Sequence, residues 1–109
     1  MNYTVILSRR AFADLDEIYD YIATELRSTQ NAAAQLARLE ENIYALDQTP
    51  ERYRRYEKEP WHSRGWRIMP VDHYCVFYIP DHGHRVVNII RVLYAGRDME
   101  TALAVSEES

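Results

Sequence analysis

Apolar residues in the first quarter of the chain recur every three or four positions, the spacing of one helical face. The pattern predicts a helix from Arg9 to about Leu26. Ser8 precedes it and is a residue type that caps helices, because its hydroxyl accepts a hydrogen bond from a free amide of the first turn. The apolar face of this helix consists of Ala11, Phe12, Leu15, Ile18, Tyr19, Ile22 and Leu26.

A second amphipathic segment follows, with Ser28 or Thr29 as its cap and Pro50 at or after its end. The short link between the two segments favours an antiparallel helical hairpin. A coiled-coil dimer is the other explanation of the spacing, but two or three heptads are too few to favour it. The second helix is expected to bury Ala33, Leu36, Leu39, Ile43 and Leu46.

Four runs rich in aromatic and β-branched residues read as strands. The gaps between the last three runs are short, which indicates antiparallel hairpins. The final run is apolar on both faces and should therefore be a central strand. The predicted strands are Tyr3–Leu7, Trp66–Val71, Tyr74–Ile79 and Arg85–Tyr94.

The resulting order is strand, helix, helix, strand, strand, strand, followed by a short helix from Met99 to about Ala104. We predict a single α+β domain over residues 1–109, with residues 105–109 as a frayed tail. The helical hairpin should pack on one face of a mostly antiparallel four-stranded sheet. Glu51–Pro60 reads as a loop at the edge of the domain. The other sheet face should be partly open, lined by Arg and Tyr, and available to a partner.

The net charge of −4 is unevenly distributed, with −4 in residues 1–50, +3 in residues 51–98 and −3 in residues 99–109. Overall acidity argues against strong non-specific nucleic-acid binding, which depends on many cations, and we expect no sequence-specific DNA binding by the chain alone. Cys75 is the only cysteine, so no internal disulfide can form. The chain shows no signal peptide and no membrane span. We therefore expect a cytoplasmic protein.

Two kinds of chemistry have weak support. His82 and His84 flank Gly83 in a probable turn and lack the usual spacing of zinc ligands, so we expect neither a metal nor another cofactor. Cys75 lies inside a predicted strand, where cysteine is usually a small packing residue.

Metal-free phosphodiester cleavage is the more plausible enzymatic activity. It requires a base, an acid and cations over the phosphate. Arg91 and Tyr94 fall on opposite strand faces, so both could reach one substrate only if a bulge intervened or the strand ended first. Alternatively, Arg67 and Arg91 pair with carboxylates and Tyr94 belongs to the core. The candidate cations are Arg64, Arg67, Arg91 and Arg97, and the candidate proton carriers are His62, His73, Tyr74 and Tyr94.

Over about residues 3–104, the chain resembles the RelE/ParE superfamily of toxins from type II toxin–antitoxin systems. No single motif is specific, and the resemblance rests on their joint order. The matching stretches are Ser8-Arg9-Arg10-Ala11, Asp14-Leu15 with Ile18 and Tyr21-Ile22, the Leu46 to Pro50 helix end, Gly65-Trp66-Arg67, Tyr74-Cys75-Val76-Phe77-Tyr78 and Ile90 to Asp98.

The resemblance implies one of two activities. RelE-like members are ribosome-dependent mRNA endoribonucleases, whereas ParE-like members poison DNA gyrase. Cys75 stands where the ribonucleases often have Arg, and the ending Arg91–Asp98 is more similar to the ParE-like form. We therefore expect a growth-inhibiting, plasmid-stabilising toxin that binds gyrase without catalysis. The target-binding candidates are Arg64, Arg67, Arg91, Tyr94 and Arg97.

Two alternatives stay open. One is an mRNA endoribonuclease, for which Arg67, Arg91, Tyr94 and Arg97 are the catalytic candidates. The other is a degenerate, non-toxic binding module.

The resemblance also implies a cognate antitoxin as partner. Helix-in-groove docking and strand addition are the physical modes available to it. We expect exposed aromatic residues to form its contacts, with core or scattered surface positions as the alternative. The candidates are Phe12, Tyr19, Tyr53 and Tyr56.

Overall fold

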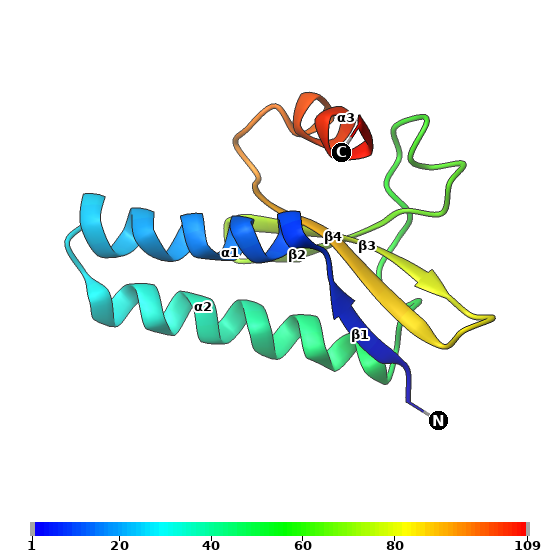
Figure 1. Cartoon of the computed structure of the whole chain (residues 1–109), viewed down its shortest axis with the longest axis horizontal. Coiled ribbons are helices and arrows are strands. Elements are labelled where there is room, and N and C mark those ends of the chain that lie inside the picture. The colour runs from blue at the N-terminus through cyan, green and yellow to red at the C-terminus, as the bar shows by residue number, and fades with distance from the viewer. Residues whose placement is uncertain (1, 109) are drawn as a thin grey trace.

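The computed structural model describes residues 2–108, and side chains from residue 2 to residue 105. Its elements follow the predicted order (Figure 1). They are β1 (Thr4–Leu7), α1 (Arg9–Asp20), a π-helical turn (Tyr21–Glu25), α2 (Thr29–Tyr44), a 3-10 turn (Ala45–Asp47), β2 (Arg67–Val71), β3 (Tyr74–Asp81), β4 (Val86–Tyr94) and α3 (Met99–Glu108).

The four strands form one sheet in the order β1-β4-β3-β2. β1 runs parallel to β4, and the two other pairings are antiparallel, so the sheet is mixed. β4 lies between β1 and β3, which confirms the prediction of a central final strand. β2 and β1 are the edge strands.

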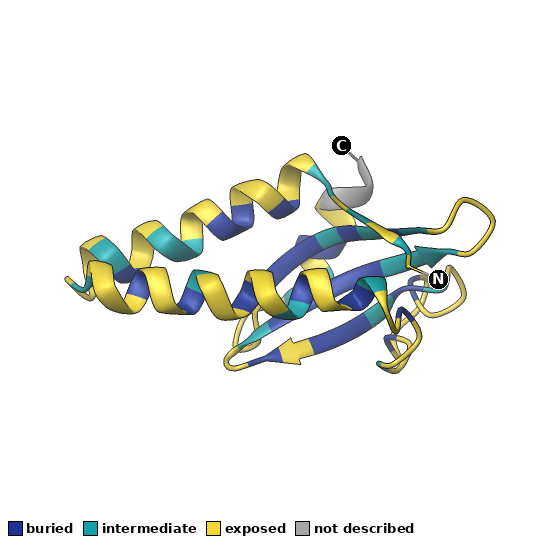
Figure 2. Cartoon of the chain, turned by 90° about the horizontal axis from the view of Figure 1, so that it is seen from below, coloured by how far each residue is buried: buried dark blue, intermediate teal, exposed yellow. Residues whose placement is uncertain are grey.

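The helical hairpin covers one face of the sheet (Figures 1 and 2). Both predicted caps are confirmed: the Ser8 hydroxyl accepts from the Ala11 amide, and the Ser28 hydroxyl accepts from the Asn31 amide. The first core between hairpin and sheet contains Leu15, Leu39, Ile43, Leu46, Met69, Val76, Tyr78, Ile89 and Val92, among others.

The buried face of α2 starts one residue earlier than its apolar pattern indicates. Ala32 and Gln35 are buried, whereas Ala33 is exposed. Gln35 is stabilised there because its amide donates to the Asp72 carboxylate at 3.0 Å. A polar residue can occupy this position because it has a hydrogen-bond partner.

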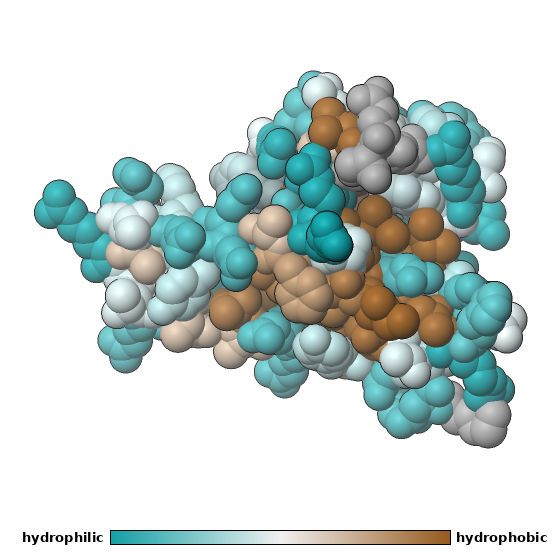
Figure 3. Space-filling view, viewed as in Figure 1, coloured by the Kyte–Doolittle hydropathy of each residue, from teal (hydrophilic) through white to brown (hydrophobic). Residues whose placement is uncertain are grey.

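The second sheet face is partly open, as predicted, but the prediction that Arg and Tyr line its open part is wrong. A second core fills much of this face, with Tyr56, Trp61 and Trp66 from the segment before β2 and Leu103 from α3 packed on Phe77. The part over β1 remains accessible, but it is a hollow of about 470 Å³ whose apolar lining includes Ile6, Ile79 and Ile90. Figure 3 shows hydrophobic atoms gathered in this region.

The C-terminal helix is longer than predicted, because α3 continues past Ala104 to Glu108. Residues 105–108 are therefore helical and not a frayed tail, while Ser109 lies outside the described residues. Among the described residues, no helix combines the length and the hydrophobicity that a membrane crossing requires.

Candidate functional site

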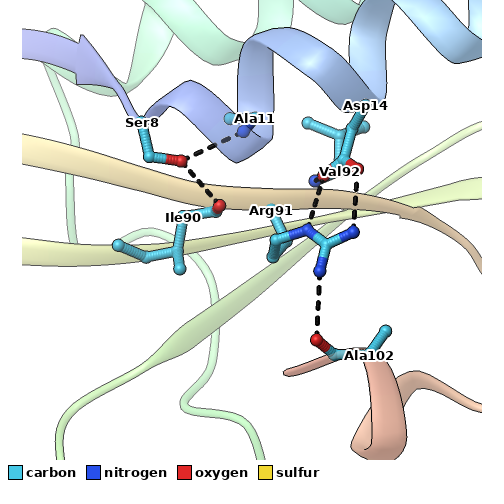
Figure 4. A network of polar contacts seen from close by, with 7 residues as sticks. All are labelled: Ser8, Ala11, Asp14, Ile90, Arg91, Val92 and Ala102. Carbon is cyan, nitrogen blue, oxygen red and sulfur yellow. Dashed lines mark hydrogen bonds and ion pairs between the residues drawn. The ribbon is translucent and has the colours of Figure 1, made fainter. Parts of the chain in front are cut away.

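β1 ends at Leu7, which leaves the C-terminal half of β4 without a neighbouring strand on that side. The cap of α1 and a side chain of α1 bond to the β4 backbone groups that have no strand partner there. The Ser8 hydroxyl donates to the Ile90 carbonyl at 2.8 Å, and the Asp14 carboxylate accepts from the Val92 amide at 2.9 Å (Figure 4). These bonds fix the start of α1 against the middle of β4.

A bulge interrupts β4 at the same point. Phe77 of β3 pairs with Arg91 and Tyr78 pairs with Ile89, so Ile90 is an extra residue on β4. Beyond the bulge the ordinary alternation resumes, with Val92 in the first core and Leu93 in the second. Arg91 is therefore directed away from the side on which Tyr94 lies.

Arg91 is buried, with 5% of its surface exposed, and its guanidinium joins three elements. Its Nε and Nη2 donate to the two oxygens of Asp14 on α1 at 2.8 and 2.9 Å, and its Nη1 donates to the Ala102 carbonyl on α3 at 3.0 Å (Figure 4). The bond to Asp14 raises the pKa of Arg91 above its usual value. The Arg91 prediction lacked this partner, because the carboxylate lies on a helix 77 positions away.

A large groove lies at the far end of β4, between the end of the hairpin where α1 and α2 are joined and the β2–β3 turn. Its volume is about 710 Å³. Large apolar and aromatic side chains dominate its exposed walls, with Tyr21, Leu26 and Tyr94 each more than half exposed. Arg38, His73 and Arg97 also line it. The groove therefore combines apolar surface with cationic and titratable groups.

Tyrosines are the groove's most prominent side chains. The rings of Tyr74 and Tyr94 meet edge to face with their centroids 6.0 Å apart. Burial raises the pKa of Tyr74, and the neighbouring Tyr94 adds to this shift. A Cβ built on Gly96 would lie 2.6 Å from the Tyr94 ring, so glycine at this position lets the ring lie against the turn after β4.

One rim of the groove is held by an ion pair. Arg38 Nε on α2 donates to the Asp72 carboxylate in the β2–β3 turn at 2.8 Å. The hydrogen bond from Arg38 lowers the pKa of Asp72, with a further contribution from Gln35. Asp72 adopts a positive φ of 55°, which is common for this residue type in tight turns. The ion pair therefore ties this turn to α2.

The predicted cations and Tyr94 do not form one cluster. Arg97 and Tyr94 are exposed and line the groove. Arg67 is half-buried and its Nη1 donates to the Tyr53 carbonyl at 2.6 Å, far along the sheet from the end of β4. Arg64 is exposed in the segment before β2. The sequence grouped these residues by proximity in the chain, whereas the sheet separates them.

The aromatic candidates also separate. Phe12 is 55% exposed on α1, and Tyr19 and Tyr53 are partly exposed. Tyr56 is only 4% exposed and packs edge to face on Phe77 at 5.1 Å, so the prediction of an exposed Tyr56 is wrong. Its neighbours in sequence show no clear period, and so gave no indication of a buried face.

Sequence reasoning missed Tyr21, Leu26 and Arg38 as groove residues. The sequence did contain an indication: the apolar stripe of the first helix continues to Leu26, beyond the part of the hairpin that the sheet can cover. The apolar residues at the hairpin end therefore line a groove and are not fully buried.

The structure also bears on two other kinds of chemistry, a reactive thiol and a metal site. Cys75 is buried in the second core and burial raises the pKa of its thiol, which keeps it protonated and weakly nucleophilic. Among the described residues, no group of three or more His, Cys, Asp or Glu could hold a metal ion. His84 instead contacts Asp81 at 2.9 Å, and His82 contacts Glu51 at 2.7 Å.

Three solved structures illustrate the likeness of the fold. The ParDE toxin–antitoxin system of P. aeruginosa has a chain with 21% identity and a TM-score of 0.69, over 84% of this chain and 95% of that one. A chain of the RelBE2 toxin–antitoxin complex of Mycobacterium tuberculosis has 23% identity and a TM-score of 0.63, and the match covers 86% of this chain and 99% of that one. A mutant of the E. coli toxin RelE in the free state has 15% identity and a TM-score of 0.66, and the match covers 98% of each chain.

Comparison with curated protein sequences gives no match. A family model does match, and its description is the ParE toxin of the type II toxin–antitoxin system parDE. The match extends over residues 5–99 and so includes every strand, the helical hairpin and the turn after β4. The chain therefore belongs to the ParE toxin family of type II toxin–antitoxin systems.

Proposed function

We propose that this toxin inhibits growth by binding DNA gyrase, without catalysis of its own, and that a cognate antitoxin neutralises it. Gyrase is the target that resemblance to ParE-like toxins implies. A toxin of this kind would act in the cytoplasm, and its module would stabilise a plasmid or chromosomal segment that carries it. The alternative within the superfamily is cleavage of mRNA on the ribosome.

The position of Arg91 is the observation that supports a non-catalytic toxin. Metal-free phosphodiester cleavage needs several cations around one phosphate. Arg91 is bonded to Asp14 and α3, and Arg67 is bonded to the Tyr53 carbonyl. Cys75 is buried among apolar side chains. Of the four catalytic candidates, only Tyr94 and Arg97 lie in the groove.

Purified toxin incubated with gyrase, ATP and supercoiled plasmid tests this proposal. We expect trapped cleavage complexes, visible as linear plasmid after denaturation and proteolysis. The variant Arg97→Gln should weaken trapping, because Arg97 is exposed beside the groove, whereas Arg27→Gln at the hairpin tip makes the same change in charge and should not. Absence of trapping at high excess of the wild-type toxin would count against gyrase as the target.

One observation favours the ribonuclease alternative. Tyr94, His73 and Arg97 line one groove, so two groups that could carry a proton lie in the same groove as a cation. This mechanism requires cuts within codons after induction, detectable by primer extension, and loss of those cuts in Tyr94→Phe and Arg97→Gln. The proposed gyrase toxin predicts intact messages. Normal growth on strong induction without antitoxin would instead favour a non-toxic binding module.

An antitoxin partner is supported by solved structures of toxin–antitoxin complexes with this fold, such as RelBE2 of Mycobacterium tuberculosis. We propose that the exposed Phe12 and the partly exposed Tyr19 and Tyr53 contribute to its binding. Tyr56 is no longer a candidate because it is buried. Co-expression with the adjacent open reading frame, followed by co-purification, tests for this partner.

A further inference from the structure

Residues 52–67 are strongly basic in an acidic protein. They contain six Arg or Lys and two Glu, a net charge of +4, whereas the rest of the chain carries −8. We define the basic rim as Arg52, Arg54, Arg55, Lys58, Arg64 and Arg67. Arg67 is half-buried and the other five residues are exposed.

The rim follows one edge of the sheet. The segment before β2 folds back along this strand, so that the Ile68 amide donates to the Arg54 carbonyl at 3.1 Å and the Tyr56 amide donates to the Trp66 carbonyl at 2.8 Å. Arg55 and Arg67 are the opposed antiparallel pair between these two bonds. In this type of pair the Cα atoms are about 4.5 Å apart and both side chains project from the same face.

Two arginines in this relationship oppose stable folding. Like charges directly opposite on paired strands are destabilising. Arg67 is partly compensated by its bond to the Tyr53 carbonyl, while the exposed Arg55 side chain adds a second positive charge beside it. A like-charge pair at this position is most easily understood if an external anion normally lies against it.

The cations lie on both faces of this edge. Arg54 precedes Arg55 and faces the opposite side, where its charge partly offsets the burial that raises the pKa of the Cys75 thiol. Arg52 lies over the Tyr53 ring, 5.3 Å from its centroid. The Glu59 carboxylate, one of the two acidic groups in the segment, accepts hydrogen bonds from the amide and the hydroxyl of Ser63.

We infer that the basic rim binds the phosphodiester backbone of DNA, and specifically DNA that is held by the toxin's target. This inference rests on the proposed action on gyrase. Arginine presents a planar fork that suits phosphate oxygens. The acidic remainder of the chain repels DNA, so the contact is weak alone and becomes effective when gyrase holds both molecules.

The composition of the surface favours a nucleic acid over an acidic protein. The cores of protein interfaces combine arginine with aromatic and apolar anchors and are depleted of other charged residues. The large exposed hydrophobic side chains of the described residues lie outside residues 52–67, at Ile6, Phe12, Tyr21, Leu26, Tyr44, Tyr94 and Val105. The half-buried Tyr53 is the aromatic side chain that this surface still offers, and Arg52 lies over its ring, so the rim offers mainly charge.

Fluorescence anisotropy with a short labelled DNA duplex at low salt tests the rim directly. Arg55→Gln should weaken binding about five- to ten-fold and lower the magnitude of the slope of log K against log salt by about 0.9. It should leave the thermal midpoint unchanged or raise it, because it removes the like-charge pair. Arg27→Gln, an equal change in charge at the hairpin tip, should leave DNA binding nearly unchanged.

Several results would overturn the inference. Equal loss of binding in Arg27→Gln would indicate a general charge effect. Unchanged DNA binding in the combined Arg52→Gln, Arg54→Gln and Arg55→Gln variant would mean that the arginines only protect a sheet edge from strand pairing, a known use of charge. If single-stranded RNA binds more tightly than the duplex, RNA and not DNA is the ligand. If polyglutamate displaces the labelled duplex as effectively as unlabelled DNA does, the ligand is an acidic protein segment.

The gyrase assay separates failure of the rim from failure of the proposed function. The triple variant should bind gyrase as well as wild type without DNA and yet trap fewer cleavage complexes with DNA. If wild-type toxin does not bind gyrase at all, the proposed target is wrong, while the anisotropy result still reports on DNA binding by the rim. If the variant traps cleavage complexes as well as wild type does, the rim is not used on gyrase-held DNA.

Discussion

Arg91 and Asp14 form a two-point ion pair between β4 and α1, in which Nε and Nη2 of the guanidinium each donate to one carboxylate oxygen. Both side chains are about 6% exposed. Asp14 also accepts from the Val92 amide, and Arg91 also donates to the Ala102 carbonyl. One pair of charges thus connects the hairpin, the sheet and α3.

Loss of one partner should be costly. Asp14→Asn leaves the buried Arg91 charge uncompensated, and we expect the free energy of unfolding to fall by about 3–5 kcal/mol, measured by urea denaturation. Asp16→Asn, on an exposed position of the same helix, should change it by less than about 0.5 kcal/mol. The pair is not structural if both variants behave alike. Arg91→Met combined with Asp14→Leu should recover part of the loss.

The two helix caps provide a second, matched comparison. Ser28→Ala should reduce stability by about 1 kcal/mol, because one amide of α2 loses its acceptor. Ser8→Ala should cost more, since its hydroxyl also donates to the Ile90 carbonyl, which β1 does not reach. Chemical denaturation of both variants gives the ranking, and the reverse order would contradict the role assigned to Ser8 on β4.

Stability should fall in alkali because of Tyr78. Burial raises the pKa of Tyr78 from its ordinary 10.0 to about 12. Its contribution is fully present below the unfolded pKa of 10.0 and is lost as the pH rises toward 12, by about 1.4 kcal/mol per pH unit. Tyr78→Phe should make the decline in unfolding free energy between these values shallower. An unchanged slope would mean that other tyrosines account for the decline.

Phe12 tests the antitoxin contact. Phe12→Asp should weaken antitoxin binding by at least ten-fold in calorimetry while leaving toxicity intact, because the side chain is 55% exposed and outside the groove. Asp16→Asn, on the same helix, serves as the surface control. Loss of toxicity together with antitoxin binding would place Phe12 at the target interface instead.

Gly96 offers a way to disturb the groove without removing a polar group. Gly96→Ala would place a methyl group 2.6 Å from the Tyr94 ring, so the ring must turn away. We expect a small change in thermal midpoint and a clear loss of target trapping if Tyr94 contacts the target. A shift of the Tyr94 ring resonances in the NMR spectrum would verify the displacement.

Local patterns were sufficient to predict most of the architecture. The hairpin, both serine caps, the strands and the central place of β4 follow from apolar period, capping residues and turn length. The packing of the irregular segment before β2 could not be predicted from local patterns. Tyr56, Trp61 and Trp66 show no period because they reach one core from a loop and not from a helix or strand.

The candidate site was less predictable for the same reason. Pairing of Arg91 with a carboxylate was one of two alternatives, but the partner could not be named because Asp14 looked like one of several carboxylates at a helix start. Their contact arises from the end of β1, the bulge in β4 and the docking of α1, none of which shows in local sequence. Tyr94 and Arg97 are exposed in the groove, where strand alternation and the turn after β4 direct them, and their roles stay predictions.

The central place of β4 also constrains the order in which the protein can be made and folded. β4 pairs with both β1 and β3 and contributes to both cores, yet it comprises residues 86–94 of the chain. Before β4 is made, β1 lacks its partner strand and the hairpin lacks the part of the first core that β4 contributes. Pairing across such long sequence separations is slow. The sheet therefore cannot be completed until β4 has been synthesised and has paired with both β1 and β3.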